Sequence, residues 1–224
     1  MRSGRLFGLG SDTDAADLAA VGLIRLATGE RLGAGARPWL WQLWAASFAD
    51  TWLAFADPAA PGLRVPAGAA LHQLVRRAAE LVLLTRDGDG PAALELLGRE
   101  SAEAYERSRC SDTAHPVEPV ALALLWHGVQ AATADGPDAA AERECHDRRI
   151  AERSEAYVRR RHRRQDTLAL ILACARSAAT ALAELSGEDP GRAAATLEEY
   201  AIRSMAQAGP VPLWVPGRPG QLTS

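Results

Sequence analysis

The chain has 224 residues, of which 48% are apolar and 24% charged, so its composition is that of a folded protein with one substantial core and excludes a disordered chain. The net charge of -3 excludes a global attraction to nucleic acid or to an anionic membrane. Three widely spaced cysteines, Cys110, Cys145 and Cys174, exclude a disulfide framework of the small secreted kind.

Segments that direct a protein to a membrane or out of the cell are not predicted. The start of the sequence lacks the apolar region of a signal peptide. The longest uncharged stretch, 119–134, is shorter than the roughly 18 to 20 apolar residues that span a bilayer. We therefore expect a cytoplasmic protein that does not bind membranes.

Alanine and leucine dominate the sequence and β-branched residues are sparse, which predicts an all-α fold: a single helical bundle of about seven or eight helices. The first helix is predicted over 11–28 and should end at Gly29. A second is predicted over 38–56, with Pro38 in its first turn, and a third over 66–85.

Tryptophans concentrate on one face of the predicted helix 38–56. Trp41, Trp44, Phe48, Trp52 and Phe55 are spaced 3, 4, 4 and 3 residues apart, which places them on one helical stripe. Each buried aromatic side chain removes about 150–250 Å² from water. The favoured interpretation is that the stripe packs in the core. The alternative is that it forms a ligand pocket or an oligomer interface. Trp41, Trp44 and Trp52 are candidate partner-binding residues on that alternative.

Three later helices are predicted from a shared start signal of acidic residues, glycine and an early proline, in 87–97, 134–144 and 187–199. Another helix is predicted over about 117–133. The spacing and pattern of the three starts do not match a helical repeat. The predicted organisation is a flexible N-terminus at 1–10, an all-α domain at 11–208 and an extended tail rich in proline and glycine at 209–224.

The stretch 138–186 contains no helix breaker. One unbroken helix of that length would extend roughly 73 Å, beyond the roughly 45 Å diameter of a compact chain of this size. Arg161 and Arg164 also fall on the apolar stripe of this long Arg-rich helix, where unpaired guanidiniums are costly to bury. Two arrangements stay open: the helix extends beyond its own bundle, or it breaks or bends near Gln165, where Asp166 or Thr167 could cap the next helix.

Five arginines surround this point: Arg159, Arg160, Arg161, Arg163 and Arg164. Residues 148–164 carry a local charge of +6, which leaves -9 for the rest of the chain. The favoured interpretation is a solvated helix neutralised by the chain's own carboxylates, for example Asp12, Asp14 and Asp17. A contact with a protein partner or a second copy comes next, and nucleic acid comes last, because the arginines surround the helix instead of forming one basic face.

Motifs for catalysis or metal binding are lacking. Cys145 and His146 are adjacent, so their side chains diverge on a helix, and His127 has no metal-ligand spacing to either. Glu142 and His146 lie one turn apart, but the paired motifs of di-iron bundles are absent. Glu103 and Glu106 share a face on which two carboxylates could work together, although a solvated surface is the simpler interpretation. We predict no catalytic residues, no metal and no cofactor.

The resulting functional prediction is a non-catalytic helical protein-interaction or regulatory module that self-associates. Its candidate contacts are the five arginines and the three tryptophans named above. Two alternatives stay open: a nucleic-acid-binding regulator that uses the Arg-rich helix 148–164, and a helical-bundle enzyme that binds a small molecule or a metal.

Overall fold

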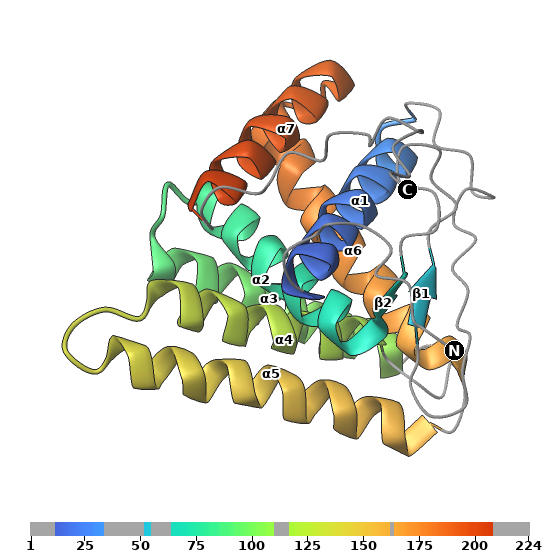
Figure 1. The fold of residues 1–224 in the computed structure, drawn as a ribbon, viewed down its shortest axis with the longest axis vertical. Helices are drawn as coiled ribbons and strands as arrows, with labels where there is room; N and C mark the ends of the chain where they lie inside the picture. Colours follow the sequence, from blue (N-terminus) through green and yellow to red (C-terminus); the bar gives the residue numbers. More distant parts are fainter. Residues whose placement is uncertain (1–11, 34–51, 55–63, 110–116, 162–163, 208–224) are drawn as a thin grey trace, which may run out of the picture.

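The computed structural model describes residues 12–33, 52–54, 64–109, 117–161 and 164–207. These residues form helices and one short antiparallel strand pair, which confirms the expected all-α class (Figure 1). The helices are α1 (Asp12–Arg31), α2 (Ala67–Leu84), α3 (Gly90–Arg109), α4 (Val117–Thr133), α5 (Ala139–Arg161), α6 (Arg164–Ser186) and α7 (Pro190–Gln207). The strands are β1 (Trp52–Ala54) and β2 (Arg64–Pro66).

Helices α3 and α7 begin at the predicted start signals, and side-chain caps explain why. Asp89 Oδ1 accepts a hydrogen bond from the backbone N–H of Ala92 at 3.0 Å, and Asp189 Oδ1 accepts one from Arg192 at 2.7 Å. Each bond satisfies an amide that the first turn of a helix leaves without a partner. The bounds of α2 and α4 agree with the predicted ranges to within about one residue.

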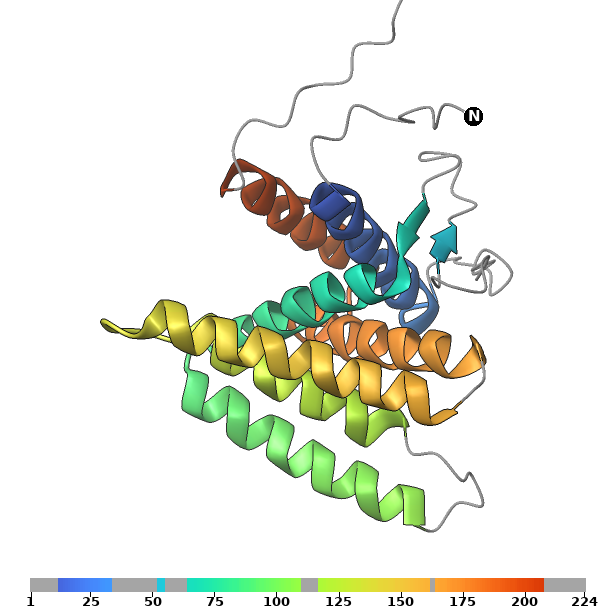
Figure 2. The ribbon, with the colours of Figure 1, turned by 60° about the horizontal axis from the view of Figure 1, so that its bottom comes forward.

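The long Arg-rich stretch is divided into two helices, which decides between the two arrangements that the sequence left open. Helix α5 ends at Arg161 and α6 begins at Arg164, slightly before the predicted position. The two helices run in opposite directions (Figures 1 and 2). Ile150 on α5 and Ile171 on α6 are fully buried, so the apolar stripe of each helix faces the core on its own side of the break.

Helix α6 is the central element of the bundle, in contact with α1, α2, α4, α5 and α7. Its buried side chains include Cys174, Ala178 and Leu182. Within the described part of the chain, Ala169–Ser186 is the one segment long and apolar enough to cross a membrane, and 56% of it is buried inside the fold. Its buried side chains pack among five other helices.

The predicted helix 38–56 is wrong at its C-terminal end. Trp52–Ala54 form strand β1, which pairs with β2 in the register Trp52 to Pro66 and Leu53 to Val65. Strand β2 leads directly into α2, and Val65 is buried, so pairing with this segment outweighs the helical periodicity. Trp52 is therefore not on a common helical face with Trp41 and Trp44.

Several predictions concern residues that the structure does not describe. Trp41, Trp44 and the rest of 38–51 lie outside the described residues, as does the side chain of Trp52. The same is true of the predicted flexible start at 1–10 and the predicted extended tail at 209–224.

Helices α2 and α4 approach each other closely at Gly128. A Cβ atom placed on Gly128 would lie 2.8 Å from the Cβ of Ala79 and 3.3 Å from the carbonyl oxygen of Val75. Real Cβ atoms do not come so close to another carbon, so any side chain here must push α4 away from α2. Glycine at this position is therefore a packing requirement of the core.

We predict that Gly128→Ala lowers the free energy of unfolding by about 1–2 kcal/mol, because the overpacking cost exceeds the gain in helix propensity. Gly98→Ala on α3 is the matched control, since nothing lies within 4 Å of a Cβ placed there. This control should be stabilised by about 0.5–1 kcal/mol. Urea denaturation of both variants measures the effects, and equal stabilisation of both would contradict the close approach.

Candidate functional site

A groove lies between α3 and α6, with α4 and the end of α2 at its base. Helix α3 packs against α4 and meets α2 only close to their connection, so it stands apart from α6 (Figure 2). The space left is a cavity of about 520 Å³, within the roughly 300–1,000 Å³ of typical ligand pockets. We call it the α3–α6 groove. Its apolar lining consists of Val82, Leu96, Leu97, Val117, Leu122, Leu125, Ala173 and Ala181.

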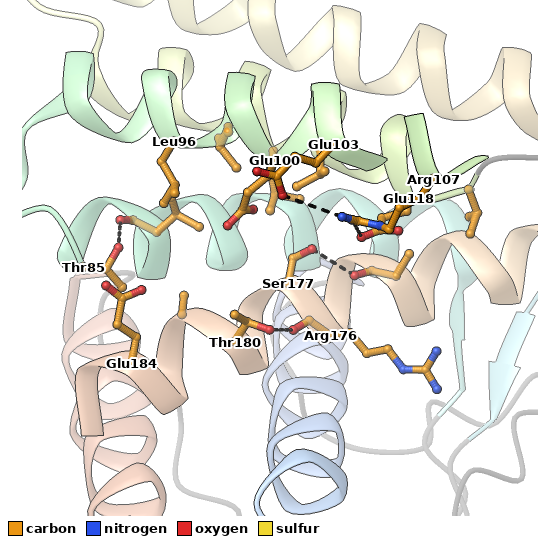
Figure 3. Close-up of a pocket in the computed structure, with 17 residues that line it drawn as sticks. Thr85, Leu96, Glu100, Glu103, Arg107, Glu118, Arg176, Ser177, Thr180 and Glu184 are labelled. Carbon is orange, nitrogen blue, oxygen red and sulfur yellow. Dashed lines mark hydrogen bonds and ion pairs between the residues drawn. The ribbon is translucent and has the colours of Figure 1, made fainter. Parts of the chain in front are cut away.

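Carboxylates exceed arginines along the walls of the groove (Figure 3). The acidic residues are Glu100, Glu103, Glu118 and Glu184, and the basic ones are Arg107 and Arg176, so the lining has a net charge of -2. Arg107 donates a hydrogen bond to Glu118 at 2.7 Å and lies 3.7 Å from Glu103. Arg176 lies 3.5 Å from Glu30 of α1, which draws its charge out of the groove.

Glu100 is the half-buried carboxylate of this set. No group among the described residues donates a hydrogen bond to it or forms an ion pair with it, whereas Glu184 accepts a hydrogen bond from Arg86 at 2.8 Å. Burial raises the pKa of Glu100, and the nearby charge of Glu103 raises it further, with Arg86 acting in the opposite direction. A cation that entered the groove would therefore meet a carboxylate that has no hydrogen bond or ion pair with another described residue.

The hydroxyl groups that line the groove donate to backbone carbonyls: that of Thr85 to Val82 of α2, and those of Ser177 and Thr180 to α6. Ser177 Oγ donates to the carbonyl oxygen of Ala173 at 3.2 Å, and Thr180 Oγ1 donates to that of Arg176 at 3.0 Å. The residues that line the groove include no histidine or cysteine. The lining thus offers neither a histidine as general base nor a cysteine as nucleophile.

His127 of α4 and His146 of α5 are 19 residues apart in the sequence, but their side chains lie in contact between the two helices. Nδ1 of His127 lies 3.3 Å from Nδ1 of His146, and His127 is only 3% exposed. Burial, together with the nearby charges of Arg153, His146 and Arg149, lowers the pKa of His127 to about 4. His127 is therefore neutral near pH 7, so one ring can donate an N–H to the lone pair of the other.

The histidine pair supplies two ligands, whereas zinc sites use three or four. Within the described residues, no group of three or more histidine, cysteine, aspartate or glutamate side chains is placed to hold a metal ion. Glu142, one turn before His146, is exposed, and Asp147 lies 3.2 Å from His72 instead. The His127–His146 contact is thus a polar packing contact of α4 with α5.

The predicted arginine site is placed on the fold only by its backbone. Arg159, Arg160 and Arg161 end α5 and Arg164 begins α6, but the side chains of these residues, like the whole of Arg163, lie outside the described part. Asp17, one of the carboxylates considered as partners, forms a bidentate ion pair with Arg77 at 2.7 and 2.8 Å. Neutralisation of the arginine stretch by other carboxylates stays a prediction, because the described residues do not include these arginine side chains.

Sequence reasoning identified one of the four groove carboxylates. Of the pair Glu103 and Glu106, only Glu103 lines the groove, since Glu106 lies 3.4 Å from Arg109 on another part of α3. Glu100 was missed, although it precedes Glu103 by three residues on the same helical face. Glu118 and Glu184 lie far away in the sequence and join the site only through the packing of α4 and α6.

We predict that Glu100→Gln raises the free energy of unfolding at pH 7 by about 0.2–0.5 kcal/mol, because it removes a like-charge contact with Glu103 one turn away. The gain should shrink in acid, where the wild-type carboxyl is protonated and neutral. Urea denaturation at pH 7 and pH 4.5 tests this, and a loss of stability at pH 7 would show that the Glu100 charge is compensated in the fold.

We predict a further pH effect from His127. The unfolded chain binds a proton at this residue near pH 6.5, and the folded chain only near pH 4, so stability falls as the pH drops between these values. One such group contributes a slope of up to about 1.4 kcal/mol per pH unit. His127→Asn should flatten the profile measured by urea denaturation from pH 7 to pH 4.5. Profiles that run parallel would disprove the depressed pKa.

Comparison of the chain with protein-family models, with curated proteins and with solved structures finds no match. The evidence for function is therefore the chemistry of the groove: an apolar base, an excess of carboxylates and one carboxylate without a partner among the described residues. These features indicate a site for a ligand that is apolar in part and carries positive charge.

Proposed function

We propose that this chain is a non-catalytic helical protein-interaction module, and that its α3–α6 groove binds a basic segment of a protein partner. The observation that carries the proposal is Glu100, a half-buried carboxylate with no hydrogen bond or ion pair among the described residues, placed in an apolar groove with excess negative charge.

Arginine is the side chain that fits this groove best. Its planar guanidinium can bind a carboxylate with two parallel hydrogen bonds, and its aliphatic stem can cover apolar surface. A segment that alternates arginine with aliphatic residues would place charge beside Glu100 and Glu184. Its methyl groups would lie on the apolar lining beside Leu96 and Val117, which are partly exposed. Both kinds of contact would then contribute to one interface.

The chemistry of the groove supports a protein partner over the other classes of function. Ser177 and Thr180 both donate to backbone carbonyls, and no residue of the lining can act as a histidine or cysteine catalyst. The net negative charge of the lining would repel the phosphates of a nucleic acid at this site. A basic peptide meets neither objection.

The proposal is tested with a fluorescent peptide of alternating leucine and arginine, and with a second peptide in which glutamate replaces each arginine. Fluorescence anisotropy should show binding of the basic peptide alone. Glu100→Gln combined with Glu184→Gln should weaken that binding about tenfold or more, because each loses a charge-assisted hydrogen bond. Raising the salt concentration should weaken it as well.

Glu95→Gln provides the matched control, because Glu95 is an exposed carboxylate of α3 outside the groove lining. This variant should bind the basic peptide like the wild type. Equal binding of both peptides, or equal affinity of all variants, would overturn the proposal. So would failure of the basic peptide to bind the wild-type chain at all.

A further inference from the structure

We propose that Arg107 is a built-in competitor for the basic partner of the α3–α6 groove: its guanidinium covers Glu118 and Glu103 until an arginine of the partner replaces it. This inference rests on the proposed function of the groove and concerns the regulation of that site. It divides the groove into an open position at Glu100 and a closed position at the end of α3, where Arg107 lies.

The contacts of Arg107 keep its charge inside the groove. Its Nη2 donates a hydrogen bond to Oε1 of Glu118 at 2.7 Å, and its Nη1 lies 3.7 Å from Oε2 of Glu103 (Figure 3). The other arginine of the described lining, Arg176, lies 3.5 Å from Glu30 of α1 instead. Arg107 therefore occupies the place beside the groove carboxylates that an arginine of the partner would take.

The closed position lies within reach of the same bound segment as the open one. Glu100 and Arg107 are nearly two turns apart on α3, which is about 10 Å along the helix axis. In an extended segment, two arginines separated by one residue lie about 7 Å apart, and two separated by three residues about 13 Å apart. When one arginine of the partner pairs with Glu100, a second one therefore arrives beside Glu103 and Glu118.

Displacement of Arg107 costs the fold little. Its side chain is 57% exposed and that of Glu118 is 53% exposed, and ion pairs between groups so exposed contribute little to stability because water and salt screen them. The guanidinium can therefore turn into solvent without disturbing the packing of α3 on α4. The carboxylates that it leaves keep their charge, and the partner's arginine binds them while its aliphatic stem covers the apolar lining beside Val117.

The experiment removes the charge of Arg107 and measures binding of the fluorescent leucine–arginine peptide by anisotropy. Arg107→Gln should bind the peptide about threefold or more tightly than the wild type, because two carboxylates become available to its arginines. A merely structural role of Arg107 predicts the opposite result, since the loss of a contact between α3 and α4 would loosen the groove and weaken binding. Circular dichroism checks that each variant is folded.

Arg99→Gln is the matched control, because Arg99 is an exposed arginine of α3 outside the groove lining. It removes the same charge from the same helix and should leave the affinity for the peptide unchanged. Adding Glu118→Gln to Arg107→Gln should cancel most of the gain, since the carboxylate that Arg107 released is then absent. Equal affinities of Arg107→Gln and the wild type, or an equal gain in Arg99→Gln, would refute the inference.

The inference and the proposed function fail in different ways. If the peptide binds the wild type, and Glu100→Gln with Glu184→Gln weakens that binding, but Arg107→Gln does not strengthen it, then Arg107 is a structural contact and the proposed function stands. If the peptide binds neither the wild type nor Arg107→Gln, both are wrong.

Discussion

The close approach of α2 to α4 sets the arrangement of the other helices. Gly128 brings the backbone of α4 against Ala79, so these two helices leave no room for a larger side chain between them. Helix α6 packs against both through small residues such as Ala175 and Ala178, which are fully buried. These three helices also bury large side chains such as Leu74, Leu124 and Ile171, and the small residues between them let the helix backbones approach.

The groove is a consequence of this layer. Helix α3 packs on α4 alone for most of its length, and α6 lies on the other side of α4, so nothing in the described part of the chain fills the space between α3 and α6. The walls of that space are helix surfaces that no other described helix covers, and they carry the carboxylates Glu100, Glu103 and Glu184. A binding segment would cover the apolar base and supply the missing positive charge.

Features set by local chemistry could be predicted from the sequence, and features set by tertiary packing could not. The side chains of Asp89 and Asp189 cap helices, so the starts of α3 and α7 could be predicted from the sequence. Strand β1 was not, because the pairing of Trp52–Ala54 with Arg64–Pro66 is absent from the local pattern. Only Glu103 of the groove carboxylates was identified, since the meeting of Glu118 and Glu184 depends on how α4 and α6 pack.

The central claim is the proposal that the excess negative charge of the α3–α6 groove binds a basic peptide. Fluorescence anisotropy of the leucine–arginine peptide at two salt concentrations tests it most directly, because ion pairs at an interface are screened by salt whereas apolar contacts are not weakened by it. We predict binding at about 50 mM salt, where the Debye length exceeds about 10 Å, and progressive loss of binding at several hundred millimolar. No binding at either concentration, or binding that salt does not weaken, would contradict the claim.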